Sequence, residues 1–276
     1  MKKLIWLLVL LTAFSIQAQK KEKIKGNREV LIKKFTVPFF TGIEVGEKFE
    51  VNLQKSADTT RVVIETDDNL FDVIHFAVEN EVLRFSTSME IVKKKRLRIT
   101  VFVPESFQKI QLKEKGKVYT EEALHLTKLR LQAIEKGKAE LMLDLSESVD
   151  IEAADKTDLK IDAVAPKAQL HLTDHAELNG KWQVKEMEIN LDDHAFCKLE
   201  GSAKHLKLFA QSKAKYEGNN FEIEKAEITA KDKAKLKLKI SGTVTLKLSG
   251  QTQTELYGNP KINLKTFKDN ASLFKK

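Results

Sequence analysis

A three-residue motif recurs eight times between residues 108 and 258 at a nearly constant spacing. The first residues of successive copies are 18 to 21 positions apart. Repetition at such a step predicts an architecture in which each copy belongs to one structural unit that stacks on the next. The copies are Glu114-Lys115-Gly116, Glu135-Lys136-Gly137, Asp155-Lys156-Thr157, Asp174-His175-Ala176, Asp193-His194-Ala195, Ser212-Lys213-Ala214, Asp232-Lys233-Ala234 and Gly250-Gln251-Thr252.

Apolar residues occupy alternate positions before every copy, and the alternation resumes after it. A period of two is typical of β-strands that bury one face. Each repeat therefore predicts a strand, a tight turn and a second strand. The pairs before the motif are Ile110/Leu112, Leu131/Ala133, Ile151/Ala153, Leu170/Leu172, Ile189/Leu191, Leu208/Ala210, Ile228/Ala230 and Leu246/Leu248.

Only one point in each repeat carries a strong turn signal, which favours a parallel β-solenoid over an antiparallel meander. A meander needs a tight turn at both ends of each strand, whereas a solenoid stacks like residues ~4.8 Å apart, one coil per repeat. We therefore expect an all-β fold in which residues 106–258 form coils of about 19 residues. One buried column should contain Leu131, Ile151, Leu170, Ile189, Leu208, Ile228 and Leu246.

The motif itself has the composition of a turn that crowds against its neighbours. Its first residue is acidic, Ser or Gly, and Asp and Gly tolerate left-handed backbone angles. Its third residue is always Gly, Ala or Thr, which suits close contact between coils. Its middle residue is Lys or His in seven of the eight copies and should point into water.

The N-terminus has the pattern of a secretory signal. Lys2-Lys3 precedes an apolar run from Leu4 to Ile16, and Gln17-Ala18-Gln19 follows. We expect cleavage after Ala18, so that residues 1–18 are a signal peptide; the alternative is an uncleaved membrane anchor, for which the run is short. The mature chain is then exported, to the periplasm or the outer cell surface, without a transmembrane segment.

The segments around the repeats are expected to link and cover them. Residues 19–34 are basic and weakly patterned, which predicts a linker or a frayed entry strand. Residues 35–105 are dense in strand signals and should form N-terminal coils or a cap, and Asn259-Pro260 breaks the repeat before a C-terminal cap at 259–276. A solenoid needs its open ends covered.

The net charge of +8 comes from lysine, since the chain has only six arginines. Nucleic-acid sites favour Arg for bidentate contacts, and export separates the chain from cytoplasmic nucleic acid, so no nucleic-acid partner is expected. The acidic partners that remain are lipid phosphates, lipopolysaccharide and anionic envelope glycans.

Four segments before the repeats form a recognisable series: Thr41-Gly42-Ile43-Glu44-Val45, Phe49-Glu50-Val51-Asn52-Leu53, Val63-Ile64-Glu65-Thr66-Asp67-Asp68-Asn69-Leu70, and Val78-Glu79-Asn80 before Leu83. Together they resemble the opening of the auto-transporter adhesin "head GIN" domain family. The resemblance covers the chain from about Phe35 onward and implies a right-handed β-helix, an envelope location in Bacteroidetes-type bacteria and an adhesin role. The family's repeat turns are rich in Ser-Gly, whereas here only Ser249-Gly250 fits that column. No functional residue of the family is carried over.

The adjacent histidines of two turn motifs are the one candidate metal site. His175 and His194 occupy the same motif position, beside Asp174 and Asp193, and two imidazoles ~5 Å apart with carboxylates nearby suit Zn²⁺ or Cu²⁺. The alternative, which we favour, is an exposed ladder in which His replaces Lys. No structural metal and no cofactor are expected.

The densest basic run is the candidate site for an anionic ligand. It consists of Lys93, Lys94, Lys95, Arg96 and Arg98. The competing interpretation is a solvated strand that resists aggregation, because a strand divides such a run between two faces.

Two single residues are expected to be structural. Cys197, the only cysteine, falls in an inward column and should act as a small buried hydrophobe. Trp182, two positions after Gly180, should fill a gap in the core; the alternative is a platform that stacks on sugars.

No motif predicts catalysis. Paired carboxylates occur at Asp67-Asp68 and Asp192-Asp193, but neighbours on a strand face opposite ways. The repeat also lacks the long insertions from which polysaccharide-degrading β-helices build a cleft. We expect a non-enzymatic, exported binding or adhesion scaffold; the alternatives are a polysaccharide-active β-helix enzyme and a purely structural envelope component.

Overall fold

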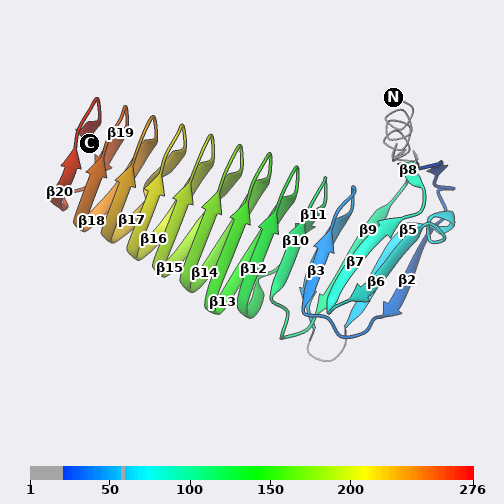
Figure 1. Cartoon of the computed structure of the whole chain (residues 1–276). Coiled ribbons are helices and arrows are strands. Elements are labelled where there is room, and N and C mark those ends of the chain that lie inside the picture. Colours follow the sequence, from blue (N-terminus) through cyan, green and yellow to red (C-terminus); the bar gives the residue numbers. More distant parts are fainter. Residues whose placement is uncertain (1–20, 57–59) are drawn as a thin grey trace, which may run out of the picture.

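The chain forms an elongated stack of β-coils with a more irregular N-terminal region at one end (Figure 1). The computed structural model describes residues 21–56 and 60–276, so the predicted signal peptide lies outside the described residues. Among these residues, 19 strands belong to one sheet system, and β1 (Lys23–Lys25) pairs with β8 (Glu90–Lys93) in a second. The expected all-β solenoid is confirmed.

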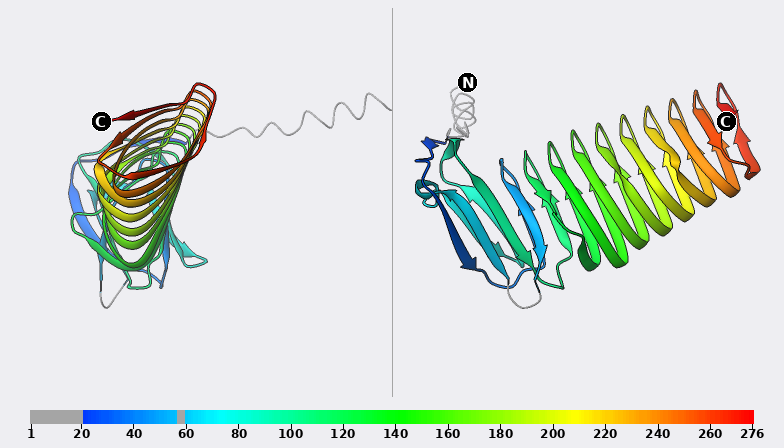
Figure 2. Two further views of the ribbon diagram at one scale, coloured as in Figure 1. Left: turned by 90° about the vertical axis from the view of Figure 1, so that its left-hand side faces the viewer. Right: turned by 180° about the vertical axis from the view of Figure 1, so that it is seen from behind.

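Each regular coil is one long strand that bends around the core and ends at a turn motif. Viewed from one end of the stack, the coils superpose as a narrow flattened ring (Figure 2). Each strand pairs in parallel with the strand one coil further along. These strands are β12 (Leu124–Ala133), β13 (Lys138–Ala153), β14 (Asp158–Leu172), β15 (Glu177–Leu191), β16 (Phe196–Ala210), β17 (Lys215–Ala230) and β18 (Lys235–Leu248).

The predicted core column forms with the predicted register. Leu131 pairs with Ile151, and the same register continues coil by coil to Leu246. None of the seven residues is more than 1% exposed. The column extends beyond the recognised repeat, through Ile110 and Ile43 at one end and to Leu264 at the other.

The turn motif has the expected backbone conformation. Its seven non-glycine first residues have φ between 52° and 60°, the left-handed region. Glu47 (φ 51°) and Asp269 (φ 61°) have the same conformation, so the row of turns is longer than the eight copies seen in the sequence. We call this row, from Glu47 to Asp269, the ridge.

The N-terminal region begins as coils and ends as antiparallel strands. β3 (Gly42–Val45) and β4 (Glu50–Lys55) stack in parallel on β10 (Lys109–Leu112) and β11 (Lys117–Tyr119). β7 (Val82–Thr87) and β9 (Leu97–Val103) continue these two layers. β2 (Val30–Thr36), β5 (Arg61–Asp67) and β6 (Ile74–Glu79) then pair antiparallel, and a 3₁₀ turn at Asp68–Leu70 follows β5.

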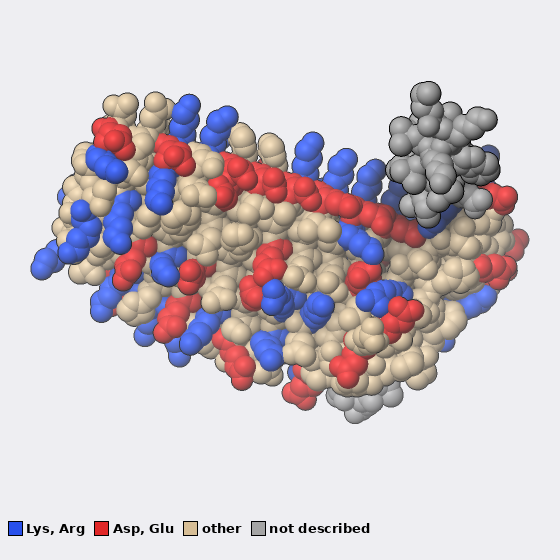
Figure 3. Space-filling model, viewed as in Figure 1, with Lys and Arg blue, Asp and Glu red and all other residues tan. Residues whose placement is uncertain are grey.

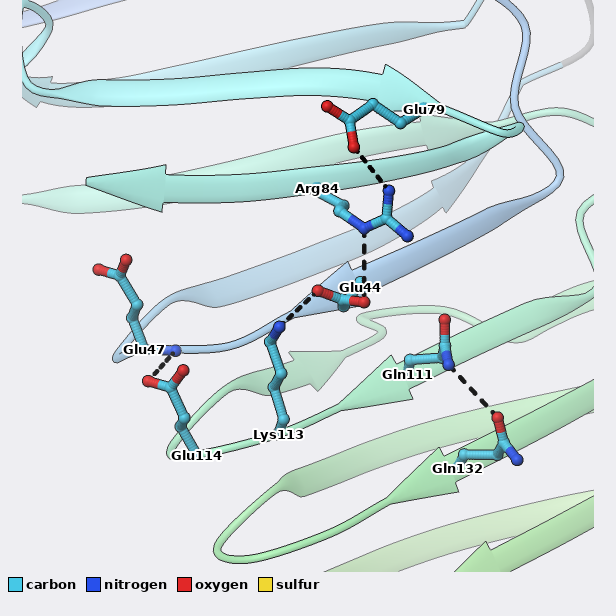
Figure 4. Close-up of polar contacts among 8 residues, drawn as sticks. All are labelled: Glu44, Glu47, Glu79, Arg84, Gln111, Lys113, Glu114 and Gln132. Carbon is cyan, nitrogen blue, oxygen red and sulfur yellow. Dashed lines mark hydrogen bonds and ion pairs between the residues drawn. The ribbon is translucent and has the colours of Figure 1, made fainter. Parts of the chain in front are cut away.

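The joint between this region and the first coils is a charged cluster centred on Glu44 (Figure 4). Lys113 Nζ lies 2.6 Å from one carboxylate oxygen of Glu44, and Arg84 Nε lies 3.4 Å from the other. Arg84 also reaches Glu79 at 3.0 Å. Partial burial would raise the Glu44 pKa, but the hydrogen bond and charge of Lys113, with the charge of Arg84, outweigh it and lower the pKa.

The described part of the segment predicted as a linker or a frayed entry strand, residues 21–34, contains β1 and most of β2. β2 pairs with β5 along its full length, yet Leu31 and Ile32 are 45% and 62% exposed. An edge strand with both faces partly exposed shows no clear alternation, which explains why the sequence pattern concealed it.

Residues 259–276, predicted as a C-terminal cap, have the strand pairing of one further coil. β20 (Lys261–Phe267) pairs in parallel with β18, and β21 (Ser272–Lys275) pairs in parallel with β19 (Gln253–Tyr257). The segment therefore continues both layers. Asn259-Pro260 lies in the connection before β20 and does not end the stack.

Two glycines make room for the largest core side chains. Trp182 and Tyr216 are fully buried. A Cβ on Gly180 would lie 3.1 Å from the indole nitrogen of Trp182 and closer still to the Ile161 carbonyl, and a Cβ on Gly218 would lie 2.5 Å from the ring of Tyr216. The structure thus confirms Trp182 as a gap-filling side chain.

The single cysteine is also part of the core. Cys197 is fully buried, and burial raises the pKa of its thiol. Because the thiolate is the reactive form, Cys197 is an inert packing residue, as predicted.

Candidate functional site

A cleft of about 820 Å³ lies where the ridge meets the N-terminal region. One wall is formed by the first turns of the ridge, from Glu47 to His175, and the other by β8 and the residues around it. Ile91 and Leu97, which are partly exposed, contribute apolar surface. We call this space the ridge cleft.

The ridge wall presents one cation per coil. The middle residues of the turns are exposed, and they stack ~4.8 Å apart because each belongs to the next coil of a parallel stack. Beneath them runs a stripe of carboxylates from the first residues of the same turns (Figure 3). The cations that line the cleft from this wall are Lys48, Lys115, Lys136 and Lys156, with His175 at the far end.

Several carboxylates of the ridge join adjacent coils by accepting backbone hydrogen bonds. In several turns, the acid of one coil accepts a hydrogen bond from the backbone N–H of the corresponding residue one coil earlier. Glu47 N–H donates to Glu114 at 3.0 Å (Figure 4), and Glu135 N–H donates to Asp155 at 2.9 Å. Further pairs are Asp155 with Asp174 (3.4 Å), Ser212 with Asp232 (3.2 Å) and Gly250 with Asp269 (3.0 Å).

Sequence reasoning missed this ladder of hydrogen bonds, although a signal for it was present. A left-handed position favours Gly, so an acid that recurs there indicates that the side chain itself is used. The carboxylates keep their negative charge in these hydrogen bonds, so the ridge presents a row of acids beside its row of lysines.

The opposite wall of the ridge cleft contains an unpaired cation. Lys94 makes no hydrogen bond or ion pair with any other residue that the structure describes. Partial burial lowers the pKa of its ammonium group; Glu50 acts in the opposite direction, and Lys48 adds to the lowering. An anionic group bound at this point would therefore gain a charge partner that the protein does not supply.

The fold separates the other members of the predicted basic run from Lys94. Arg96 pairs with Glu65 at 3.2 Å, and Lys95 Nζ donates to the Arg28 carbonyl at 3.4 Å. Lys93 ends β8, and Arg98 lies on β9. Of the five residues Lys93, Lys94, Lys95, Arg96 and Arg98, only Lys94 lines the cleft.

The two turn histidines do stack. The rings of His175 and His194 are parallel within 3°, with their centroids 4.9 Å apart. Asp174 accepts hydrogen bonds from Thr173 Oγ1 at 3.2 Å and from the Asp155 backbone, so its carboxylate is turned to the protein. Within residues 21–56 and 60–276, no group of three or more His, Cys, Asp or Glu side chains has an arrangement that could hold a metal ion.

The aspartates that are adjacent in sequence accept hydrogen bonds from different partners. Asp192 accepts hydrogen bonds from Ser212 Oγ at 2.7 Å and from Gln211 Nε2 at 2.5 Å. Although burial alone would raise the pKa of Asp192, these bonds and that of the Asp193 N–H lower it, so the carboxylate stays ionised. Asp67 accepts the Lys95 backbone N–H at 2.7 Å. Both are structural acceptors.

Some opposite charges on the long outer faces of the coils pair across adjacent strands, as in Arg130–Glu152 (2.6 Å), Lys138–Asp158 (3.0 Å) and Lys207–Glu188 (3.4 Å). Such cross-strand pairs favour the observed register. Other lysines on these faces, such as Lys181, Lys185 and Lys204, are exposed and have no ion pair with another described residue.

Comparisons with known proteins indicate the same fold and a family. The family model of the "Putative auto-transporter adhesin, head GIN domain" matches residues 39–163 and again residues 143–260. The two matches overlap, as expected for a chain built of repeats. No curated protein matches the chain.

Several solved structures share the fold at low identity. A putative adhesin from Parabacteroides merdae is 13% identical, with a TM-score of 0.64 over 92% of this chain and 99% of that one. A putative adhesin and a putative lipid binding protein from Parabacteroides distasonis are 14% and 11% identical, with TM-scores of 0.64 and 0.62. Each alignment covers 92% of this chain and 100% of that one.

Membrane-spanning helices were also sought. None of the residues that the structure describes forms a helix of the length and hydrophobicity needed to cross a bilayer.

Proposed function

We propose that this chain, which belongs to the auto-transporter adhesin head GIN domain family, is an exported, non-enzymatic binding scaffold whose ridge cleft holds an acidic glycan. The observation that carries the proposal is the unpaired Lys94, which faces a row of ridge cations across an 820 Å³ cleft. The ligand class is a saccharide with carboxylate or phosphate groups, such as an anionic envelope glycan or lipopolysaccharide.

The cleft offers two kinds of contact that suit such a ligand. Lys94 and the ridge lysines can donate charge-assisted hydrogen bonds to acidic groups, and these are stronger than neutral ones. Ile91 and Leu97, which are partly exposed, provide apolar surface for the less polar faces of sugar rings. Because the ridge repeats coil by coil, an extended polymer can meet several lysines at a regular spacing.

Three features favour binding over catalysis. The ridge acids hold backbone N–H groups of neighbouring coils, and Asp192 is a hydrogen-bonded carboxylate rather than a proton donor. The regular coils are joined by turns of nearly constant length, without long loops around a substrate cleft. The adhesin names of the family and of similar structures agree with this proposal. The other hypotheses are a polysaccharide-active enzyme and a purely structural envelope component.

The test is binding of the purified protein to arrayed acidic and neutral glycans and to lipopolysaccharide, with Lys94→Gln and Lys185→Gln as matched variants. Lys185 is exposed, is remote from the ridge cleft and has no ion pair with another described residue. We expect binding to acidic glycans that weakens with salt. Lys94→Gln should reduce it about tenfold or more, the usual effect of losing a charge-assisted hydrogen bond, and Lys185→Gln should not.

The same experiment can contradict the proposal. Equal binding of acidic glycans by both variants would show that the ridge cleft is not the binding site. Absence of binding to every acidic glycan would favour the hypothesis of a purely structural envelope component. Phosphorylated and carboxylated glycans on one array distinguish the two acid types. Turnover of any polysaccharide that is lost in Asp193→Asn would favour the enzyme.

A further inference from the structure

The net charge of the chain is concentrated at its C-terminal end. Residues 225–276 contain twelve lysines, no arginine and four acidic residues, a net charge of +8 that equals the net charge of the whole sequence. Residues 1–224 are therefore balanced overall. The lysines are Lys225, Lys231, Lys233, Lys235, Lys237, Lys239, Lys247, Lys261, Lys265, Lys268, Lys275 and Lys276, and the acids are Glu227, Asp232, Glu255 and Asp269.

The core columns come to the surface at this same end. Ile262, Leu264 and Phe267 pair in register with Val244, Leu246 and Leu248, so they occupy inward positions. The three residues beneath them are at most 1% exposed, whereas Ile262, Leu264 and Phe267 are 43%, 46% and 48% exposed. Leu273, on β21, pairs with the buried Thr254 and is only partly exposed, whereas Phe274 pairs with Glu255 at an outward position and is 52% exposed. Ile262, Leu264 and Phe267 therefore form an apolar patch across the end of the stack.

Uncompensated lysines surround the patch. Among the described residues, none of the last five lysines, from Lys261 to Lys276, has an ion pair. Asp269 is the only acid in β20, β21 and their connection, and its carboxylate accepts the Gly250 N–H at 3.0 Å. We call residues 261–276 the basic end.

We propose that the basic end docks on the surface of an anionic lipid bilayer. An apolar patch rimmed by lysine is the composition of surfaces that insert shallowly at the boundary of headgroups and acyl chains. The lysine stems can lie along the apolar layer while their ammonium groups reach the lipid phosphates. This proposal is independent of the ridge cleft, which lies toward the opposite end of the stack.

Charge favours a bilayer over a second copy of the chain. If two basic ends met, their uncompensated lysines would face one another across an apolar contact, and like charges in such a contact oppose association. An anionic membrane instead supplies the missing negative charge. Docked in this way, the stack stands away from the membrane and holds the ridge cleft in the aqueous space (Figure 1).

The test is co-sedimentation of the purified protein with vesicles of equal parts phosphatidylcholine and phosphatidylglycerol, and with vesicles of phosphatidylcholine alone. We expect binding to the acidic vesicles only, and weaker binding as salt increases. The variant Lys261→Gln/Lys265→Gln/Lys268→Gln should bind roughly 100-fold more weakly, since each lysine near an acidic membrane strengthens binding roughly fivefold. The matched control Lys181→Gln/Lys185→Gln/Lys204→Gln removes the same charge from the middle of the stack and should bind within roughly threefold of wild type.

A second variant tests the apolar patch. Phe267→Ser should weaken vesicle binding, and thermal melting should show that it remains folded, because Phe267 is 48% exposed. No binding to acidic vesicles, or equal loss in the two lysine triples, would overturn the proposal. A dimer in solution that dissociates on Phe267→Ser would assign the basic end to a second copy and overturn it as well. None of these results depends on glycan binding at Lys94.

Discussion

The two ends of the stack are closed in different ways. At the N-terminal end, the parallel layers give way to antiparallel pairs of β2, β5 and β6. Phe40 and Leu83 there are fully buried. At the C-terminal end, β20 and β21 keep the parallel pairing of the coils, and the inward side chains of β20 are almost half exposed.

The difference shows what a parallel coil can and cannot do. Each coil covers the one before it but leaves its own inward residues for the next. The last inward side chains of a stack are therefore buried only if the strand pattern changes. Among the described residues, this change occurs only at the N-terminal end. Phenylalanine assists it, because Phe35, Phe76, Phe85 and Phe49 form a chain of ring contacts with centroids 5.1 to 6.0 Å apart.

The largest expected effect compares one phenylalanine at each end. Phe40→Ala should destabilise the protein by about 3–5 kcal/mol, because it empties a fully buried site that packs on Phe107. Phe267→Ala should cost less than about half of that, since Phe267 is 48% exposed. Urea unfolding of the two variants measures the difference. Similar losses would mean that the C-terminal end is covered in solution.

A leucine pair within a single column sharpens the comparison. Leu170→Ala, in the middle of the stack, should cost about 2–5 kcal/mol. Leu264→Ala, at the end of the same column, should cost about 1–2 kcal/mol because 46% of that residue is already exposed. Circular dichroism during denaturation gives both values. Equal losses of stability in the two variants would contradict the conclusion that the last residue of the column, Leu264, is left uncovered.

Substitutions in the turns of the ridge should destabilise the protein less than substitutions in the core. Asp155 has φ 60° and accepts the Glu135 N–H, so Asp155→Ala should cost about 1–2 kcal/mol through backbone strain and the lost acceptor. Asp155→Gly relieves the strain but not the lost bond and should cost less. Thermal melting ranks the two variants. If Asp155→Gly is no more stable than Asp155→Ala, the left-handed conformation of an alanine costs little at this position, and the lost hydrogen bond accounts for most of the change.

As the pH falls, the charged cluster around Glu44 at the N-terminal joint should lose stability before the basic end does. The pKa of Glu44 is lowered from 4.5 in the folded state, so its stabilising contribution is complete above about pH 4.5 and is lost as the pH falls through the folded value. The pKa of Glu47 is lowered too, because hydrogen bonds from Lys21 and Thr87 outweigh its burial. Hydrogen exchange at decreasing pH should show the loss first around β3. In Glu44→Gln this pH dependence should shrink; an unchanged profile would locate the acid-sensitive group elsewhere.

The stacked histidines should have the smallest effect. His175→Ala/His194→Ala removes two exposed rings and should melt within about 0.5 kcal/mol of wild type, as most surface substitutions do. Calorimetry with Zn²⁺ should detect no tight site, because two imidazoles leave most of the coordination sphere to water. Sub-micromolar binding that the double variant loses would make this turn a metal site.

The sequence was most informative where one coil repeats the next. A period of two and one turn per repeat were enough to predict the column through Leu170 and Ile189. The turn at Glu47 escaped notice because Phe49 stands where the other copies have a small residue, and the last coil because Asn259-Pro260 resembles a terminator. The ridge cleft was beyond sequence reasoning, since it depends on how Lys94 faces turns from distant coils.

The hydrogen bonds along the ridge make the coils interchangeable in principle. Every coil has a backbone N–H at this position, and five ridge acids accept a hydrogen bond from the backbone of the coil before them. They are Glu114, Asp155, Asp174, Asp232 and Asp269. If one whole coil is removed or duplicated, a matching donor and acceptor meet again at the new junction, and the columns stay in register. Duplication of a segment of about 19 residues can therefore lengthen the protein without refitting either end. Length is the dimension along which such a chain can evolve most freely.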